Sequence, residues 1–148
     1  MASPFNFTTW LDNHPYSQVT DLTPVKRVEA IFDASEAAVE NGTAILANDV
    51  FQMITVPVNS FVLNVRAEVL TAEGATCTFD VGDGATADGY LDGVDGNSAA
   101  SSASFNATTT ETFGVGKFYS AADTIDIKMM TGTWTALRVK LTAIIMQL

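Results

Sequence analysis

The sequence predicts an all-β protein, an antiparallel, jelly-roll-like β-sandwich preceded by an extended N-terminal arm. From Val25 onward, runs of five to twelve residues alternate apolar with polar side chains, which is the pattern of strands that bury one face. Gly, Asn, Asp and Ser, which favour turns, separate these runs. The 148 residues have the size of one domain. We therefore expect an arm over residues 1–24 and a single β-sandwich domain over residues 25–148.

Seven to nine strands are expected, and each long strand has a predicted apolar face. Short strands are included at residues 43–46 and 110–119. Glu-Gly at residues 73–74 predicts a hairpin turn, and Thr-Gly at residues 131–132 predicts a tight turn before a last strand that starts at Thr133. The predicted apolar faces are Val28, Ala30 and Phe32; Val50, Gln52, Ile54 and Val56; Phe61, Leu63, Val65, Ala67 and Val69; Cys77, Phe79 and Val81; Ile125, Ile127 and Met129; and Leu137, Val139, Leu141, Ala143 and Ile145.

Helix signals are scarce. Residues 35–40 are long enough for one turn. Residues 97–102, which are rich in Ala and Ser, predict another turn with Asp95 or Asn97 as its cap. Many short strands with so few helix signals indicate a β-sandwich or jelly roll.

The first 24 residues hold an unusual group of aromatic side chains. Three prolines interrupt this segment, and it has no sustained period of two or of 3.6 residues. It nevertheless contains Phe5, Phe7, Trp10 and Tyr16, and a flexible tail does not usually carry four aromatic residues. We therefore predict an arm whose aromatic side chains bind a surface, either on a neighbouring subunit or on the arm's own sandwich.

Composition disfavours several classes of function. Hydrophobic residues make up 47% of the chain and charged residues 16%, which disfavours disorder throughout the chain. A net charge of −10 repels phosphate backbones, so no nucleic-acid partner is expected. The charge is uneven, since residues 67–116 contain eight carboxylates and no Lys or Arg. Apolar runs stay well short of the roughly 20 residues that span a bilayer, so no membrane association is expected.

An aspartate-rich segment at residues 80–97 has two interpretations. Its Asp-Gly pairs are typical of successive turns between short strands. The alternative is a calcium site, because carboxylate oxygens are hard ligands, and Asp83, Asp88 and Asp92 are then the candidate ligands. The spacing does not match an EF-hand, since no Glu follows at the required offset. We favour the turns and expect no cofactor and no bound metal.

Residues suited to catalysis are few. The single histidine, His14, precedes Pro15 in the predicted arm, where a Ser-His-Asp or Cys-His site has no rigid support. One histidine is also too few for a zinc hydrolase that uses His ligands. The single cysteine, Cys77, lies in a predicted strand and is interpreted as a buried apolar residue. A pair of carboxylates acting on a glycoside is the remaining enzymatic alternative. We expect that the protein is not an enzyme.

The sequences FDVGDG at residues 79–84 and DGYLDGVD at residues 88–95, within a short chain rich in Thr and Ala, point to a family. The chain resembles small virion proteins of tailed bacteriophages, especially the decoration or cement proteins of the capsid. This resemblance implies a subunit, often a homotrimer, on the outer surface of an icosahedral head, where it stabilises contacts between subunits of the major capsid protein. It implies no catalytic residues.

The sequence leaves two other functions open. A head-fibre or tail adhesin is expected to bind a host surface glycan through the Asp-Gly loops, with Tyr90 as the aromatic contact. A lectin-like or carbohydrate-active module is disfavoured because Trp10 and Trp134 both lie outside the acidic segment.

Overall fold

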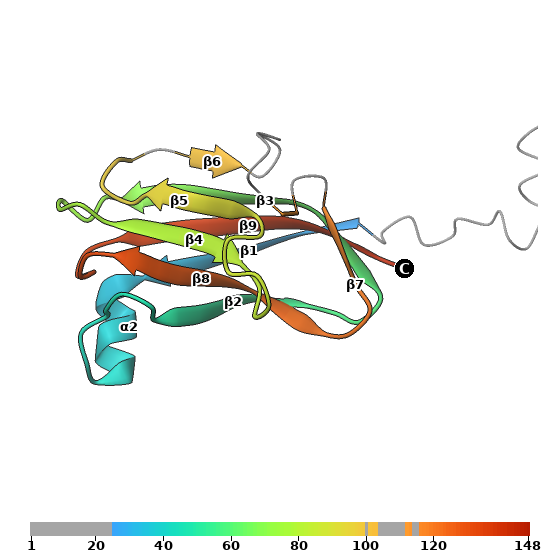
Figure 1. The fold of residues 1–148 in the computed structure, drawn as a ribbon, viewed down its shortest axis with the longest axis horizontal. Coiled ribbons are helices and arrows are strands. Elements are labelled where there is room, and N and C mark those ends of the chain that lie inside the picture. The colour runs from blue at the N-terminus through green and yellow to red at the C-terminus, as the bar shows by residue number, and fades with distance from the viewer. Residues whose placement is uncertain (1–24, 100, 104–111, 114–115) are drawn as a thin grey trace, which may run out of the picture.

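The structure is a computed structural model that describes residues 25–99, 101–103, 112–113 and 116–148. The predicted binding residues Phe5, Phe7, Trp10 and Tyr16 lie outside these ranges. The described part is all-β, as predicted, with nine strands and one short helix (Figure 1). Its elements are β1 (Val25–Asp33), α2 (Ala34–Asn41), β2 (Val50–Val56), β3 (Ser60–Thr71), β4 (Thr78–Gly82), β5 (Leu91–Asp95), β6 (Ser101–Ala103), β7 (Lys117–Tyr119), β8 (Asp123–Thr131) and β9 (Arg138–Gln147).

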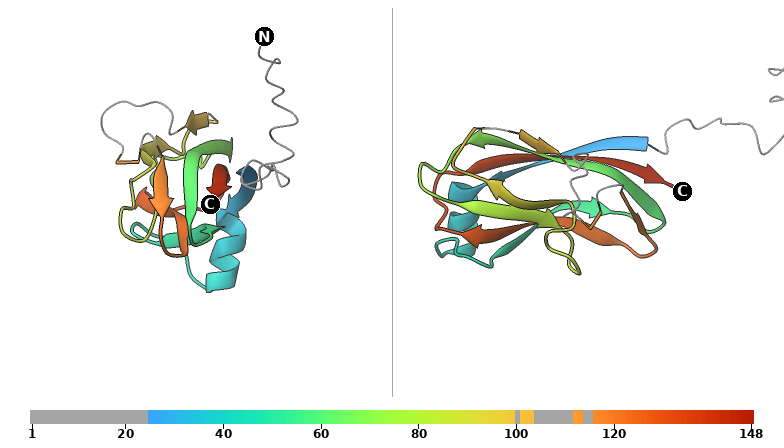
Figure 2. Two further views of the ribbon diagram at one scale, coloured as in Figure 1. Left: turned by 90° about the vertical axis from the view of Figure 1, so that its right-hand side faces the viewer. Right: turned by 45° about the horizontal axis from the view of Figure 1, so that its top comes forward.

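Two antiparallel sheets pack face to face and form the predicted β-sandwich (Figures 1 and 2). The first sheet has the order β1-β9-β3-β6, and β7 also pairs with β3. The second sheet has the order β2-β8-β4-β5. Since β1, β2, β3 and β4 alternate between the sheets, neighbours in sequence are mostly not neighbours in a sheet.

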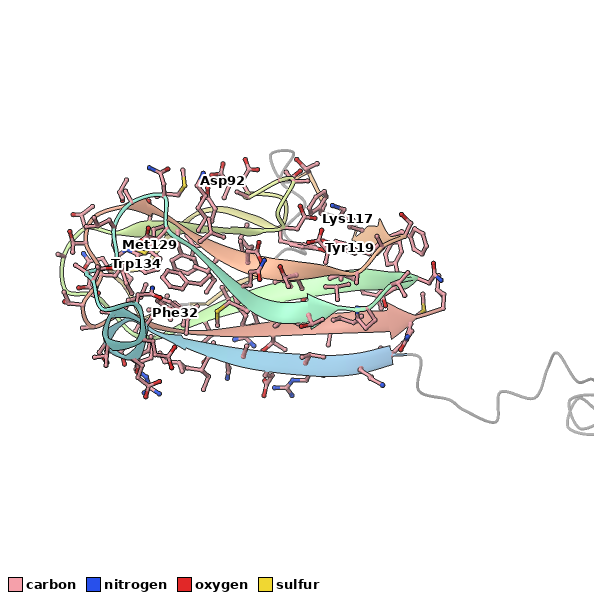
Figure 3. All side chains as sticks on the ribbon, turned by 90° about the horizontal axis from the view of Figure 1, so that it is seen from below. Phe32, Asp92, Lys117, Tyr119, Met129 and Trp134 are labelled. Atoms are coloured by element: carbon pink, nitrogen blue, oxygen red, sulfur yellow. The ribbon has the colours of Figure 1, made fainter. Side chains whose placement is uncertain are left out.

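The hydrophobic core lies between the two sheets. At the end of the sandwich near α2, the Trp134 ring packs edge-on against Phe32 at 5.7 Å and against Phe79 at 5.8 Å between ring centroids (Figure 3). Burying a large apolar side chain stabilises the fold by roughly 1.5–3 kcal/mol. The faces predicted for β4, β8 and β9 are confirmed by the burial of Cys77, Phe79, Val81, Ile125, Ile127, Met129, Leu137, Val139, Leu141, Ala143 and Ile145.

A β-bulge changes which side chains of β3 point inward. Val65, Ala67 and Val69 are buried as predicted, but the register shifts between Val62 and Asn64. The inserted residue reverses the alternation, so Val62 is buried while its neighbours on either side are only half-buried. The prediction that Phe61 and Leu63 lie on the core face was therefore wrong.

The same effect occurs in β2. Its register shifts between Gln52 and Ile54. Ile54 and Val56 are buried, as predicted, but Val50 and Gln52 lie on the exposed side before the bulge.

Two predicted turns are connections between sheets. The chain leaves β3 in the first sheet at Thr71 and enters β4 in the second sheet at Thr78, so residues 73–74 do not form a hairpin. Residues 131–132 likewise begin a crossing from β8 to β9, and β9 starts at Arg138 instead of Thr133.

Other local predictions had mixed outcomes. The helical turn at residues 35–40 is confirmed and lengthens to α2, where Asp33 caps the first turn and Gly42, at φ +67°, ends it. The helical turn at residues 97–102 was wrong, because residues 101–103 form β6 and pair with β3. Residues 43–46 contribute one bridge, between Ile45 and Trp134.

One carboxylate fastens the two crossing loops together. Glu73 accepts hydrogen bonds from the backbone N–H and hydroxyl of Thr135 and from the N–H groups of Ala136 and Leu137, at 2.7–3.0 Å. Burial raises the pKa of Glu73, but these hydrogen bonds outweigh burial and hold the pKa below its ordinary value. The charged form of Glu73 therefore stabilises the crossing.

Replacing Glu73 with glutamine is expected to lower the free energy of unfolding by about 2 kcal/mol, because an amide N–H₂ then faces backbone donors. The stabilisation is present above the ordinary glutamate pKa of 4.5 and is lost as pH falls through the lower folded value. Urea unfolding from pH 3 to pH 7 measures both effects. Glu40→Gln, on the exposed surface of α2, is the control, and equal losses in the two variants contradict the prediction.

Candidate interaction surface and buried polar clusters

The aspartate-rich segment forms β4, β5 and the turns around them. Asp83 Oδ1 accepts hydrogen bonds from the N–H groups of Ala85 and Thr86 at 3.0 and 2.9 Å. Asp95 accepts one from the N–H of Asn97 at 2.8 Å. Both carboxylates thus cap turns, as expected for Asp-Gly-rich sequence.

Asp83 also belongs to a buried cluster that joins the β4–β5 loop to β7, and we call it the Asp83 cluster. Its Oδ2 accepts hydrogen bonds from the Lys117 ammonium and from the Tyr119 hydroxyl, the latter at 2.9 Å. The Tyr119 and Tyr90 hydroxyl oxygens are 2.8 Å apart. Figure 3 shows Lys117 and Tyr119 side by side at the end of the sandwich far from Trp134. The cluster consists of Asp83, Tyr90, Phe113, Lys117 and Tyr119.

Aromatic rings enclose the ion pair of this cluster. The Lys117 ammonium lies 4.2 Å from the centroid of the Phe113 ring. Phe113 in turn packs directly on the backbone of Gly89, where a Cβ atom would be 2.1 Å from the ring. Burial raises the pKa of Asp83, but Lys117 and the other donors outweigh burial and hold it below its ordinary value. Asp83 is therefore ionised and fully engaged within the protein.

The structure separates the three candidate calcium ligands by environment. Asp83 is buried and directs its oxygens at protein donors, whereas Asp88 and Asp92 are exposed. Within the described ranges, no group of three or more His, Cys, Asp or Glu residues has an arrangement suited to a metal ion.

Burial also removes the aromatic contacts expected for glycan binding. Tyr90 is completely buried and uses its hydroxyl on Tyr119, so the expectation that Tyr90 faces a glycan from the Asp-Gly loops was wrong. Trp134 is likewise buried in the core.

Asp126 is a buried carboxylate that the sequence pattern did not reveal. It alternates with Ile125 and Ile127 in β8 and looks like a solvent-facing residue, yet only 5% of it is exposed and its Oδ1 has no hydrogen-bond partner. It lines a hollow of about 330 Å³ together with Asn48 and Lys128. Burial raises the pKa of Asp126, and the charges of Asp123 and Asp83 add to this effect.

Four apolar side chains form a row across the outer face of the first sheet, and we call it the apolar row. Val25 lies opposite Met146 in the register, Met146 opposite Phe61, and Phe61 opposite Phe118. Val25 and Phe118 are each 46% exposed. The row crosses β1, β9, β3 and β7, which lie side by side at the end of the sandwich seen in the left panel of Figure 2.

The two sheets differ in charge. Six of the seven basic residues lie in the first sheet, at positions 26, 27, 66, 117, 138 and 140. Arg27, Arg138 and Lys140 pair there with Glu29, Asp33 and Glu68. The acidic residues of the second sheet and its loops are Asp49, Asp80, Asp83, Asp88, Asp92, Asp95, Asp123 and Asp126.

Comparison with known proteins gives a likeness of fold. No protein-family model matches the chain, and no curated protein matches it. The chain is similar to a chain in the capsid of Ralstonia phage GP4, with a TM-score of 0.61, 16% identity, and 83% of this chain and 84% of that chain covered. It is also similar to a chain in the capsid asymmetric unit of cyanophage Pam1, with a TM-score of 0.60, 20% identity, and 84% of this chain and 85% of that chain covered. A third similar chain belongs to the acidic stable capsid of Helicobacter pylori bacteriophage KHP30, with a TM-score of 0.57, 15% identity, and 82% of this chain and 86% of that chain covered.

The likeness of fold extends over more than four-fifths of each compared chain. In the described residues, no helix is long and apolar enough to cross a membrane.

Replacing Asp126 with asparagine is expected to raise the free energy of unfolding at pH 7 by about 1–2 kcal/mol, because a buried charge without full pairing is removed. The folded pKa of Asp126 is raised, so the wild type itself gains stability as pH falls through that value towards 3.8, and the difference between the proteins shrinks. Chemical unfolding across this range measures the difference. Asp92→Asn, at an exposed position, is the control. A less stable Asp126→Asn protein at pH 7 contradicts the prediction.

Replacing Asp83 with asparagine is expected to destabilise the protein, unlike the same change at Asp126. It lowers the free energy of unfolding by about 3 kcal/mol, because the Lys117 ammonium loses its anionic partner. A double-mutant cycle with Lys117→Met isolates this pair. The double variant is expected to lose less stability than the sum of the two single variants. Strict additivity contradicts a direct interaction.

Proposed function

We propose that the protein is a structural component of a tailed-bacteriophage virion. It binds the outside of the capsid, as a decoration or cement protein does, and stabilises contacts between subunits of the major capsid protein. The observation that carries this proposal is the fold likeness to chains of three bacteriophage capsids, each matched over more than four-fifths of both chains.

The strand order supports this role. Leaving β7 aside, β1 pairs with β9, β2 with β8, β3 with β6 and β4 with β5. This nesting of early strands with late ones is what results when one long antiparallel ribbon is rolled into two sheets. We therefore infer a jelly roll, an architecture that recurs in viral capsid domains.

Charge supports a place on the outer surface. The net charge of −10 opposes contact with packaged DNA on the inside of a head. The second sheet and its loops hold eight acidic residues and one basic residue, Lys128, so this side suits exposure to solvent. The strands of the first sheet hold six basic and three acidic residues, so this side lacks the acidic excess and suits contact with protein.

The state of the polar clusters supports a role without catalysis or a cofactor. Asp83, Tyr90 and Tyr119 are buried and use their polar atoms on one another and on Lys117. A general acid or nucleophile has to reach a substrate, and these groups do not. The same burial of Tyr90 weakens the alternative of a glycan-binding adhesin.

The arm supplies the expected means of attachment. Phe5, Phe7, Trp10 and Tyr16 are large apolar side chains of the kind that dominate binding energy at interfaces. In a homotrimer, three arms bind at high effective concentration once the first has bound. A modest contact by each subunit then gives stable attachment.

Deleting residues 1–23 is expected to leave a cooperatively unfolding β-sandwich that no longer co-sediments with phage heads purified without this protein. Light scattering of the intact protein, alone and with heads, gives its mass and its binding. In the intact chain, changing Phe5, Phe7, Trp10 and Tyr16 to Ser is expected to abolish binding, whereas changing Ser3, Thr8, Asn13 and Ser17 to Ala is the matched control. If the protein that lacks residues 1–23 still binds heads, the proposed role of the arm is wrong. If the intact protein does not bind heads, the proposed capsid role is wrong.

A further inference from the structure

The apolar row lies at the end of the sandwich where two other exposed apolar side chains gather. Val58 precedes β3, and Leu148 follows β9 and donates its N–H to the carbonyl oxygen of Asn59 at 2.9 Å. Val58 is 47% exposed and Leu148 is 70% exposed. Val25, Phe118, Val58 and Leu148 thus expose apolar side chains at the same end of the sandwich, and a gathering of this kind marks an interaction surface.

Residues 1–24 have the composition that fits this surface. They join the described sandwich at Val25, which is itself a member of the apolar row. They contain four aromatic residues, the acidic residues Asp12 and Asp21, and no Lys or Arg. Lys26 is exposed beside the row, and Arg27, also exposed there, pairs with Glu29. The segment therefore complements the surface both in apolar character and in charge.

The direction of β1 favours a different copy of the chain as the source of the segment. β1 starts at the row and runs away from it towards α2, so residues 1–24 join the described sandwich at the row itself (Figure 1). Pro24 fixes its own φ and favours extended backbone at Thr23, which opposes an immediate reversal onto the same subunit. At about 3.3 Å per residue, 24 residues span on the order of 80 Å, enough to reach a neighbouring subunit.

We propose that the apolar row of each subunit binds the aromatic side chains of residues 1–24 from a second copy of this chain. Exchanged arms then hold the copies together, and loss of the arm abolishes capsid attachment by dissolving the oligomer. The inference assigns the aromatic side chains of the arm to a second copy instead of to the capsid, so it rests on the proposed function but revises how the arm serves it, and it concerns the purified protein without heads. If the arms exchange but the protein does not bind heads, the arm-exchange proposal holds and the capsid role fails. If the protein binds heads but the arms do not exchange, the capsid role holds and the arm-exchange proposal fails.

Light scattering of intact chains at several concentrations tests the row. The row variant, Val25→Ser with Phe118→Ser, changes two exposed side chains and is expected to lose the oligomer seen for the wild type while keeping its unfolding midpoint. The control variant, Val50→Ser with Met130→Ser, changes side chains that are 52% and 39% exposed on the second sheet and is expected to keep the oligomer. A monomeric wild type, or an unchanged mass in the row variant, overturns the proposal.

Mixing two defective proteins tests the exchange itself. The arm variant, with Phe5, Phe7, Trp10 and Tyr16 changed to Ser, keeps the row, and the row variant keeps the arm. Neither is expected to self-associate, and their mixture is expected to form a complex.

Trp10 reports the contact in this mixture, because Trp134 is only 1% exposed in the core. Acrylamide quenching of Trp10 in the row variant is expected to fall when the arm variant is added, and adding a chain that carries both sets of changes is expected to have no effect. A mixture without a complex, or a Trp10 that is protected in a monomer at every dilution, overturns exchange between copies.

Discussion

A layer of alternating apolar side chains holds the two sheets against each other, and the rest of the structure depends on how the chain closes this layer at its ends. Because most successive strands lie in different sheets, most connections cross the edge of the core instead of making tight hairpins. A carboxylate secures each end. Glu73 accepts hydrogen bonds across the crossing loops at one end, and Asp83 binds Lys117 and Tyr119 at the other. The two charged groups remain ionised because backbone, hydroxyl and ammonium donors replace the lost water.

The sequence predicted the fold class and the inward faces of most strands because period-two alternation is a local property. It failed at the bulges of β2 and β3, since one inserted residue reverses the alternation and is chosen by pairing with a distant strand. It also failed at residues 73–74 and 97–102. A Gly-containing turn looks the same whether it joins strands of one sheet or of two, and a short Ala- and Ser-rich segment becomes a strand only because β3 offers an unpaired edge.

The polar clusters were harder to predict for the same reason. Asp83 was identified as a candidate ligand from its neighbours in sequence, but its actual partner, Lys117, is 34 positions away. Asp126 follows the solvent-facing positions of β8, and only the packing of the second sheet with the β4–β5 loop reveals that it is buried. An isolated sequence shows which residues are able to ionise. It does not show which of them folding removes from water.

Charge limits how such a protein associates with copies of itself. Two subunits that each carry a net charge of −10 repel one another, and salt screens this repulsion only beyond about 8 Å at physiological ionic strength. A contact between second sheets brings aspartates together, some of which are already poorly solvated, as at Asp126. A contact at the apolar row joins surfaces beside which Arg27 already pairs with Glu29, while the ion pairs of Arg138 and Lys140 lie farther along the same sheet. Apolar side chains there approach with less electrostatic opposition, so the proposed contact at the first sheet costs less electrostatic free energy than a contact between second sheets.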